Sequence, residues 1–266
     1  MPGIWKTRSG KVLALKELLS NSCSGRKVKR KMRSIGIIGG VDGPTAVYLT
    51  GDFGIIGEHF HFSSLAPYFM VLAVTIIIAY LIGNISPATL LARAKGIDIK
   101  QAGSGNAGTT NALRVMGKKA GAITLVIDVV KGIAAVALGN FLCGSLCGMI
   151  CVVAVVAGHI WPVMFKFKGG KGVATIFGAI VGLNILVALY GLIVLVIAVL
   201  ISKRVSVGSM LAALSFPVFS YWLEPDFVVL ACVLALIIII KHRANIKRLI
   251  KGEEPKLSLF DKEKKK

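Results

Sequence analysis

Two glycine-rich segments carry hydrogen-bonding and cationic side chains at spacings that suit a bound phosphate. The first is GSGNAGTTN, residues 103–111, and it is followed by Arg114. Its glycines allow tight turns and close approach to a ligand. Thr109 or Thr110 can cap a short helix running to about Met116, whose free N-terminal amides attract an anion, and Arg114 adds a bidentate donor for oxyanions. By spacing alone, an ordinary polar loop with a capped helix is an equally good interpretation.

The second segment is FKGGKGVAT, residues 167–175, which lies between two apolar stretches. It lacks the spacing of a Walker A loop, but it combines the same ingredients, namely flexible glycines, a lysine and the start of a helix. These groups predict a second phosphate cradle around Lys171. The alternative interpretation is a basic turn between two helices.

Three shorter segments add polar groups next to basic residues. His159 lies in GHIWP at the end of an apolar stretch, where an ionisable side chain is a functional candidate by default. The alternative is a histidine bonded to backbone. Ser206–Ser209 follows a Lys-Arg pair, and His242 and Asn245 are three residues apart, so they share a helix face. For these last two segments, the alternative is a basic collar that anchors the chain at the membrane surface.

Asp128 and Lys131 are charged residues within a long apolar stretch, again three residues apart. Because unpaired charges are costly in lipid, we expect them to neutralise each other and hold helices together; a proton relay is the alternative. The basic segments have few carboxylates, which argues against catalysis by an Asp/Glu pair. No group of residues has the spacing of a metal site. Cys143, Cys147 and Cys151 are expected to pack as small apolar side chains within one helix.

Helices in lipid must position these segments, because 55% of the 266 residues are hydrophobic and the apolar runs are long and uncharged. We predict an all-α, polytopic integral membrane fold. The expected spans are residues 68–92, 120–142 and 146–165, then an uncharged run at 173–201, and a last region at 205–240 that is broken at 223–226.

The distribution of charge decides the number of spans. The run 173–201 is long for one span of about 20 residues and short for two. If it breaks near Gly182–Asn184, the chain has about seven spans. The basic loops then share one face, and the opposite loops near 143–145, 182–185 and 223–226 have no Lys or Arg. The positive-inside rule therefore favours seven spans, with the basic face in the cytoplasm and the N-terminus outside.

The chain divides into three regions: an N-terminal extension at residues 1–67, a membrane-embedded domain at 68–254 and a basic tail at 255–266. The extension is expected to be disordered or poorly packed, since residues 1–33 carry ten Lys or Arg and one acid. Such a basic segment is awkward outside the cell. A native start at Met32 or Met70 is one explanation, and a tolerated tail is the other.

Together, these motifs resemble the bacterial acyl-phosphate-dependent glycerol-3-phosphate acyltransferases. The resemblance covers about residues 72–254 and rests on GSGNAGTTNALR (103–114), IDVVKG (127–132), AGHIWPVMFKFKGGKGVAT (157–175), RVSVGS (204–209) and KHRANIKRL (241–249). It implies a seven-span enzyme of the bacterial cell membrane with its active site on the cytoplasmic face. It also implies acyl transfer from acyl phosphate to the 1-position of glycerol 3-phosphate, which gives lysophosphatidic acid and phosphate. The resemblance implies no cofactor, metal or nucleic acid, and an acyl-phosphate-forming enzyme is a possible functional partner.

The resemblance also implies the site residues. The catalytic candidates are Ser104, Arg114, His159, Lys171, His242 and Asn245. The candidates for binding substrate or phosphate are Gly103, Gly105, Asn106, Thr110, Asn111, Gly169, Gly170, Gly172 and Ser206. Because acyl phosphate is already activated, holding two phosphorylated substrates in line could suffice without an acyl-enzyme, with Lys and Arg neutralising their repulsion. A phosphate oxygen could take the hydroxyl proton.

Other functions fit parts of the pattern. A transporter or binding protein for a phosphorylated anion would use the same basic pocket, but it needs a path open to both faces. A structural membrane anchor leaves the convergence of motifs unexplained. None of the histidines has an Asp after four intervening residues, so the usual signature of glycerolipid acyltransferases that use acyl-CoA or acyl carrier protein is absent. Residues 34–45 resemble a short segment of sodium-pumping decarboxylase beta subunits, which we interpret as a leader without pump function.

Overall fold

The structure is a computed structural model that describes the backbone of residues 34–38, 46–50 and 66–257 and the side chains of residues 68–257. It divides into two units, residues 1–61 and 62–266. In the first unit, β1 (Ser34–Ile38) pairs antiparallel with β2 (Ala46–Thr50). The sequence analysis did not predict these strands. The basic segment 1–33, His59, His61 and the tail from 258 lie outside the described residues.

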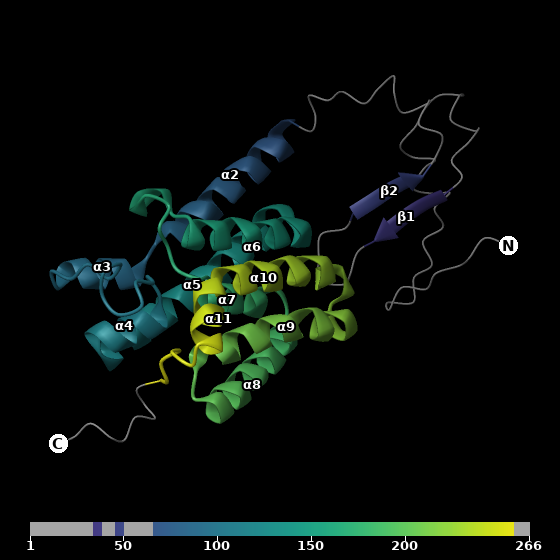
Figure 1. Cartoon of the computed structure of the whole chain (residues 1–266). Helices are drawn as coiled ribbons and strands as arrows, with labels where there is room; N and C mark the ends of the chain where they lie inside the picture. The colour runs from purple at the N-terminus through teal and green to yellow at the C-terminus, as the bar shows by residue number, and fades with distance from the viewer. Residues whose placement is uncertain (1–33, 39–45, 51–65, 258–266) are drawn as a thin grey trace, which may run out of the picture. The chain divides into compact units, whose positions relative to one another are not determined.

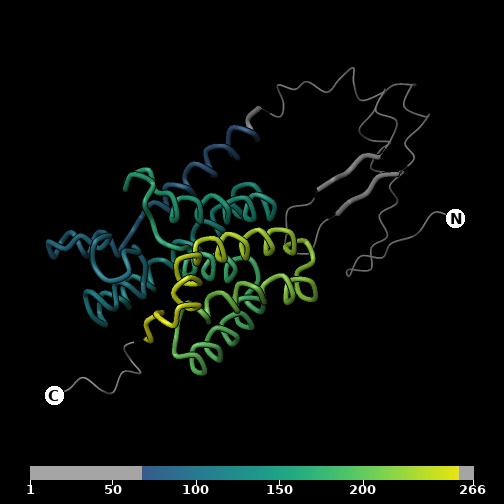
Figure 2. The backbone as a smooth tube through the Cα atoms, in the orientation of Figure 1, coloured from purple at the N-terminus to yellow at the C-terminus, as the bar shows by residue number. Residues whose placement is uncertain are grey.

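The second unit is helical in the part that the structure describes (Figures 1 and 2). Its elements are α2 (Ala66–Asn84), α3 (Pro87–Ala94), α4 (Thr109–Met116), α5 (Lys118–Cys143), α6 (Ser145–Ile160), η2 (Val163–Phe165), α7 (Val173–Leu183), α8 (Ile185–Ser202), α9 (Val205–Leu223), η3 (Pro225–Phe227), α10 (Val228–Lys241) and α11 (Arg243–Ile250). Among the described residues, four helices are long and apolar enough to cross a membrane: α5, α6 extended by η2, α8 and α9. The number rises to six if α2 with α3, and α10 with α11, each form one bent span. The short apolar helix α7 is the remaining segment of the predicted seven.

The predicted break in the long apolar run is confirmed at Asn184, between α7 and α8. The Asn184 side-chain oxygen accepts hydrogen bonds from the N–H groups of Leu186 and Val187 at 3.0 and 3.2 Å, so it caps α8. Its amide donates to the Glu224 carboxylate at 2.9 Å. Because a cap residue has extended rather than helical backbone, the helix cannot continue through Asn184. The bond to Glu224 joins two of the turns that have no Lys or Arg.

The span predicted at 68–92 is broken in the structure. The structure has two helices there, α2 and α3, bent by 40°. The cause is Pro87, which disfavours helical backbone in the residue before it and lacks the N–H that would continue the ladder. The carbonyls of Gly83 and Ile85 at the bend accept hydrogen bonds from Lys131 of α5, at 3.3 and 2.8 Å.

Glycines allow the closest helix crossings. A Cβ atom added at Gly132 of α5 would lie 2.3 Å from a backbone oxygen of α7, and one added at Gly178 of α7 would lie 2.0 Å from a backbone oxygen of α5. Gly83 of α2 and Gly158 of α6 meet in the same way, with added Cβ atoms at 2.3 and 2.1 Å from carbonyl oxygens. The crossing backbones leave no space for larger residues, so these four positions fix how the helices meet.

The connections that carry the candidate motifs come together at one end of the helix bundle. Lys100, which precedes α4, donates to the Phe165 carbonyl of η2 at 3.2 Å. The N–H of Leu257 donates to the carbonyl of Lys203, between α8 and α9, at 2.8 Å. Away from this end the helices expose large apolar side chains, such as Trp222 at 77%, which is expected of a surface in lipid.

Candidate active site

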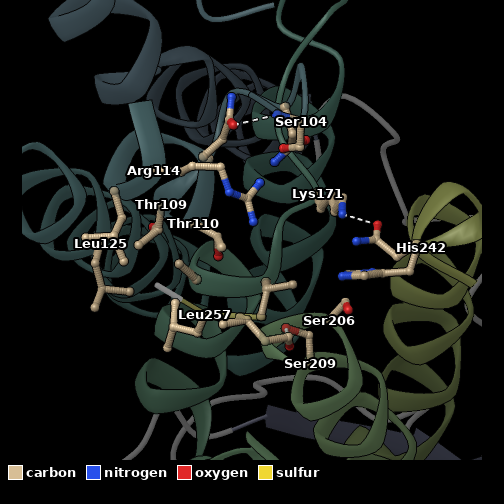
Figure 3. A pocket seen from close by; sticks show the side chains of 18 of the residues that line it. Ser104, Thr109, Thr110, Arg114, Leu125, Lys171, Ser206, Ser209, His242 and Leu257 are labelled. Atoms are coloured by element: carbon tan, nitrogen blue, oxygen red, sulfur yellow. Dashed lines mark hydrogen bonds between the residues drawn. The ribbon is translucent and has the colours of Figure 1, made fainter. Parts of the chain in front are cut away.

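A cavity of about 860 Å³ lies among these connections and the helix ends next to them. Figure 3 shows Arg114 and Thr110 on one side of it, Lys171 and His242 on the other, and Ser206 with Ser209 below. Twelve of the predicted site residues line the cavity: Gly103, Ser104, Asn106, Thr110, Asn111, Arg114, His159, Lys171, Gly172, Ser206, His242 and Asn245. Segments far apart in the sequence therefore build one site.

Three predicted ligand residues, Gly105, Gly169 and Gly170, do not line the cavity. The backbone N–H groups of Gly169 and Gly170 donate to carbonyls at the end of α6, at 3.2 and 3.1 Å. A Cβ atom added at Gly170 would lie 2.2 Å from Nε2 of His159, and one added at Gly105 would lie 2.9 Å from the Lys100 carbonyl oxygen. In this structure these three glycines allow the loops to pack closely, and neighbouring residues line the cavity instead.

Asn111 organises the first loop. Its side-chain oxygen accepts from the N–H of Ser104 at 2.8 Å, and its amide donates to the carbonyls of Ile99 and Ala102 at 3.2 and 3.0 Å. All of its bonds go to backbone, so it holds the loop in place above α4. The predicted helix at 109–116 is confirmed as α4, but the predicted threonine cap is wrong, because the N-cap residue is Gly108 and no side chain caps the helix.

Lys171 begins a chain of hydrogen bonds that the sequence analysis missed. Its ammonium donates to the Asn245 side-chain oxygen, and the Asn245 amide donates to Glu254 at 2.7 Å. The same Glu254 oxygen accepts from Ser206 at 2.7 Å, and its other oxygen pairs with Arg248 at 2.8 Å. Glu254, only 7% exposed, thus connects α9, α11 and the Lys171 loop. Its place at the edge of the motif region gave no signal of this role.

Burial, hydrogen bonds and nearby charges shift the pKa values of Glu254 and Lys171 in this network. Burial alone would raise the pKa of the Glu254 carboxyl, but bonds from Ser206, Asn245 and Arg248 outweigh it and hold the pKa below its usual value. Burial lowers the pKa of Lys171 to about 8, although Glu254 opposes that shift. Lys171 is therefore a cation at neutral pH whose charge is only partly compensated.

A backbone carbonyl holds the imidazole ring of His242 in place. Its Nδ1 lies 2.8 Å from the carbonyl oxygen of Ile238, and a carbonyl only accepts, so Nδ1 carries the ring proton. Burial and the nearby Lys171 cation lower the pKa of His242 to about 4, so the ring is neutral at pH 7 and offers the lone pair of Nε2 as an acceptor on the cavity wall. The predicted pairing of Asp128 with Lys131 is confirmed at 2.6 Å, and His159 joins this pair.

The rest of the cavity wall is apolar. It comes from α5, α7 and α8, and includes Leu125, Val129, Phe177, Leu192 and Leu195. One cavity therefore offers Arg114 and Lys171 at one part and hydrocarbon at another. An amphiphilic ligand with an anionic head and an apolar chain fits both parts.

The fold defines a multi-pass membrane protein, and the lining of its cavity suits an amphiphilic anion. The sequence matches the family model described as glycerol-3-phosphate acyltransferase over residues 73–252. The chain belongs to the glycerol-3-phosphate acyltransferase family, and it is a membrane-bound acyltransferase.

Two relatives and one solved structure are similar to this chain and belong to proteins of the same description. A glycerol-3-phosphate acyltransferase of Thermoanaerobacter pseudethanolicus (strain ATCC 33223 / 39E) is 44% identical over 191 residues, which are 71% of this chain and 96% of that protein. One of Clostridioides difficile (strain 630) is 44% identical over 189 residues, 68% of this chain and 93% of that protein. The glycerol 3-phosphate form of PlsY (YgiH), an integral membrane glycerol 3-phosphate acyltransferase, is similar with a TM-score of 0.68 and 35% identity, over 71% of this chain and 99% of that chain.

The pKa of Lys171 predicts how activity depends on pH. Since the cation is the form that attracts phosphate, kcat/KM should fall about tenfold per unit as the pH rises above about 8. An ordinary lysine would hold its charge to about pH 10. Initial rates at low substrate between pH 6.5 and 9.5 measure this. The Lys171→Arg variant should have lower activity but no bend near pH 8, because arginine stays charged. A wild-type profile that is flat to pH 9.5 contradicts the prediction.

Proposed function

We propose that this acyltransferase moves a fatty acyl group from acyl phosphate to the 1-hydroxyl of glycerol 3-phosphate, at the cytoplasmic face of a bacterial cell membrane. The products are lysophosphatidic acid and inorganic phosphate. The observation that carries the proposal is the composition of the cavity: cations on separate elements, with Arg114 and Lys171 on opposite sides, in a space that continues between apolar side chains. Both substrates carry phosphate, and the donor also carries a hydrocarbon chain.

The two cations come from different elements and suit different phosphates. Arg114 lies on α4 above the first glycine loop, with Thr110 beside it, and can bind an oxyanion through two N–H groups. Lys171 approaches from the opposite side and is held by Asn245. Placing a positive charge beside each phosphate offsets the repulsion between two anionic substrates and holds them in line.

The reaction then needs no acyl-enzyme. The 1-hydroxyl oxygen bonds to the acyl carbonyl carbon, the bond from that carbon to the phosphate oxygen breaks, and phosphate leaves with the electron pair. The hydroxyl proton ends on phosphate. The free Nε2 lone pair of His242 is suited to accept a hydrogen bond from the glycerol hydroxyl, because a hydroxyl can donate to it and a phosphate oxygen cannot.

The test is a comparison of acyl donors with purified protein in lipid nanodiscs. Radiolabelled glycerol 3-phosphate is mixed with palmitoyl phosphate, palmitoyl-CoA or palmitoyl-acyl carrier protein, and lysophosphatidic acid is measured. We expect product with palmitoyl phosphate and little with the other donors. Equal turnover with palmitoyl-CoA would show that the donor is assigned wrongly. If glycerol 3-phosphate binds but no donor gives product, the alternative of an anion transporter or binding protein is favoured.

The basic connections support the proposed orientation. They gather at the cavity end of the bundle, whereas the turns at Asn184 and Glu224, which meet through a hydrogen bond, have none. The positive-inside rule favours a cytoplasmic position for the cavity end. A donor made in the cytoplasm could then reach the site, so an enzyme that forms acyl phosphate is the expected functional partner.

Residues 1–67 should be dispensable for this activity, because the residues that the structure describes as lining the cavity begin at Gly103 and bring all the candidate motifs together. We expect a chain that starts at residue 68 to insert in the membrane and to keep its turnover within about twofold of the full chain, as is normal for a change away from the site. Turnover per inserted molecule measures this. A large loss in a variant that inserts normally would show that the extension contributes to the site.

A further inference from the structure

Three ionisable side chains form a buried cluster on the cavity wall that the proposed reaction does not yet use. They are Asp128 and Lys131 of α5 and His159 of α6, with exposures of 2, 4 and 6%. Asp128 and His159 line the cavity, and Lys131 lies behind them. Because charges at such depth are costly unless they serve a role, the cluster needs an explanation.

The contacts of Lys131 determine where its protons point. Its ammonium lies 2.6 Å from the Asp128 carboxylate, 2.8 and 3.3 Å from the carbonyl oxygens of Ile85 and Gly83, and 2.7 Å from Nδ1 of His159. The Asp128 contact is an ion pair, and the two carbonyls can only accept hydrogen bonds, so the ammonium donates one proton to each of them. Its third proton is then directed at Nδ1 of His159, which must accept it.

This fixes the tautomer of His159. With Nδ1 as acceptor, the ring is neutral and its proton is on Nε2. A second ring proton on Nδ1 would face the Lys131 ammonium. No described residue accepts a hydrogen bond from Nε2, and His159 lines the cavity. The two histidines of the site are therefore opposite in character: His242 presents a lone pair, and His159 presents an N–H.

The surroundings of His159 favour a neutral oxygen as its partner. The Asp128 carboxylate lies 3.4 Å from Nδ1 of His159 and neutralises Lys131, so this cluster offers no uncompensated positive charge to a phosphate. The next residue of α5, Val129, belongs to the apolar lining. The phosphates have Arg114 and Lys171. In an acyl phosphate, the acyl carbonyl joins the phosphate to the hydrocarbon chain. Its oxygen is uncharged until the reaction begins.

We infer that His159 donates its Nε2–H to the acyl carbonyl oxygen of the donor, and that Lys131, held by Asp128, positions His159 in the tautomer that can do so. This rests on the proposed function. As the hydroxyl oxygen adds to the carbonyl carbon, negative charge develops on the carbonyl oxygen, and a fixed donor there stabilises the transition state. His159 is then a catalytic residue, and Lys131 and Asp128 are positioning residues.

The kinetic test compares two amides at position 159. The amide nitrogen of glutamine can reach the place of Nε2, whereas that of asparagine reaches only the place of Nδ1. We expect His159→Gln to keep kcat within about tenfold of wild type, and His159→Asn and His159→Ala to lose about 10²–10³-fold in kcat with little change in KM. Equal kcat for the glutamine and asparagine variants contradicts the inference. A raised KM with unchanged kcat places His159 on a phosphate instead and also overturns it.

The positioning role is tested by ¹⁵N NMR of the full chain labelled at histidine, with His159→Gln used to assign the signal. Wild type should show a protonated Nε2 and an unprotonated Nδ1, and Lys131→Met should lose that pattern together with kcat. Thr124→Val is the matched control, since Thr124 is buried on α5 and bonds only to its own helix. A proton on Nδ1 in wild type overturns the inference even if Lys131→Met fails to insert. Absence of product with every donor defeats the proposed function, and the NMR result still decides the tautomer.

Discussion

Replacing Lys171 by alanine should lower kcat/KM by about 10²–10³-fold, which is typical for loss of one positioned charge in a water-excluded site. The Lys171 side chain is half-buried, its ammonium is directed by Asn245, and it faces Arg114 across the cavity. No other lysine of its loop lines the cavity. Turnover per correctly inserted molecule, measured at saturating and at low substrate, gives the size of the loss.

Two further variants separate a role in the site from a role in membrane topology. Lys171→Arg should keep part of the activity, because the cavity has room for a longer cation. Lys168→Ala is the matched control: Lys168 is an exposed cation of the same loop and does not line the cavity. If both lysines only set the orientation of the chain in the membrane, their alanine variants should have the same turnover per inserted molecule. Near wild-type turnover for Lys171→Ala would remove this residue from the site.

The arrangement of the helices followed largely from charge and apolar patterning. The absence of Lys and Arg near residues 182–185 placed a break in the run at 173–201, and the structure breaks it at Asn184. The bend before Pro87 carried a clear local signal that the hydrophobic run concealed. The pairing of strands β1 and β2 had no such signal.

Site residues could be predicted from the sequence where their side chain has one common role, such as binding an anion. Arg114, Lys171 and His242 were expected to face a pocket, and they line the cavity. Glycine has two uses, because it can bind phosphate or permit close packing, and spacing cannot separate them. Gly169 and Gly170 therefore were expected as ligands, whereas the structure packs them against α6 and His159.

Contacts between distant segments were not predictable. Asp128 and Lys131 are neighbours on one helix face, so their pairing followed from spacing. Glu254 binds partners 48 and 9 residues away in sequence, and nothing in its own segment indicates them. A basic site with few carboxylates was expected; two buried carboxylates, Asp128 and Glu254, line the cavity, and Glu254 carries several roles.

Replacing Glu254 by alanine should therefore be among the most damaging single changes outside the direct ligands. The Glu254 carboxylate accepts hydrogen bonds from Ser206, Asn245 and Arg248. Removing one partner of a buried, charged network leaves the others unsatisfied and costs about 2–5 kcal/mol. Since Asn245 also holds Lys171, we expect kcat/KM to fall about 10²-fold or more, together with a lower melting temperature.

The control and the graded variant make this prediction specific. Glu253→Ala removes the same side chain from the exposed neighbouring position and should leave both activity and melting temperature near wild type. Glu254→Gln can still accept from Ser206 and Asn245 but loses the ion pair with Arg248, so it should fall between wild type and Glu254→Ala. Its lost charge should also shift the bend of the kcat/KM profile to lower pH, because Glu254 is the group that opposes the lowering of the Lys171 pKa. If Glu254→Gln and wild type share one profile, the carboxylate does not act on Lys171, and Glu254 serves only to hold the chain after α11 against the bundle.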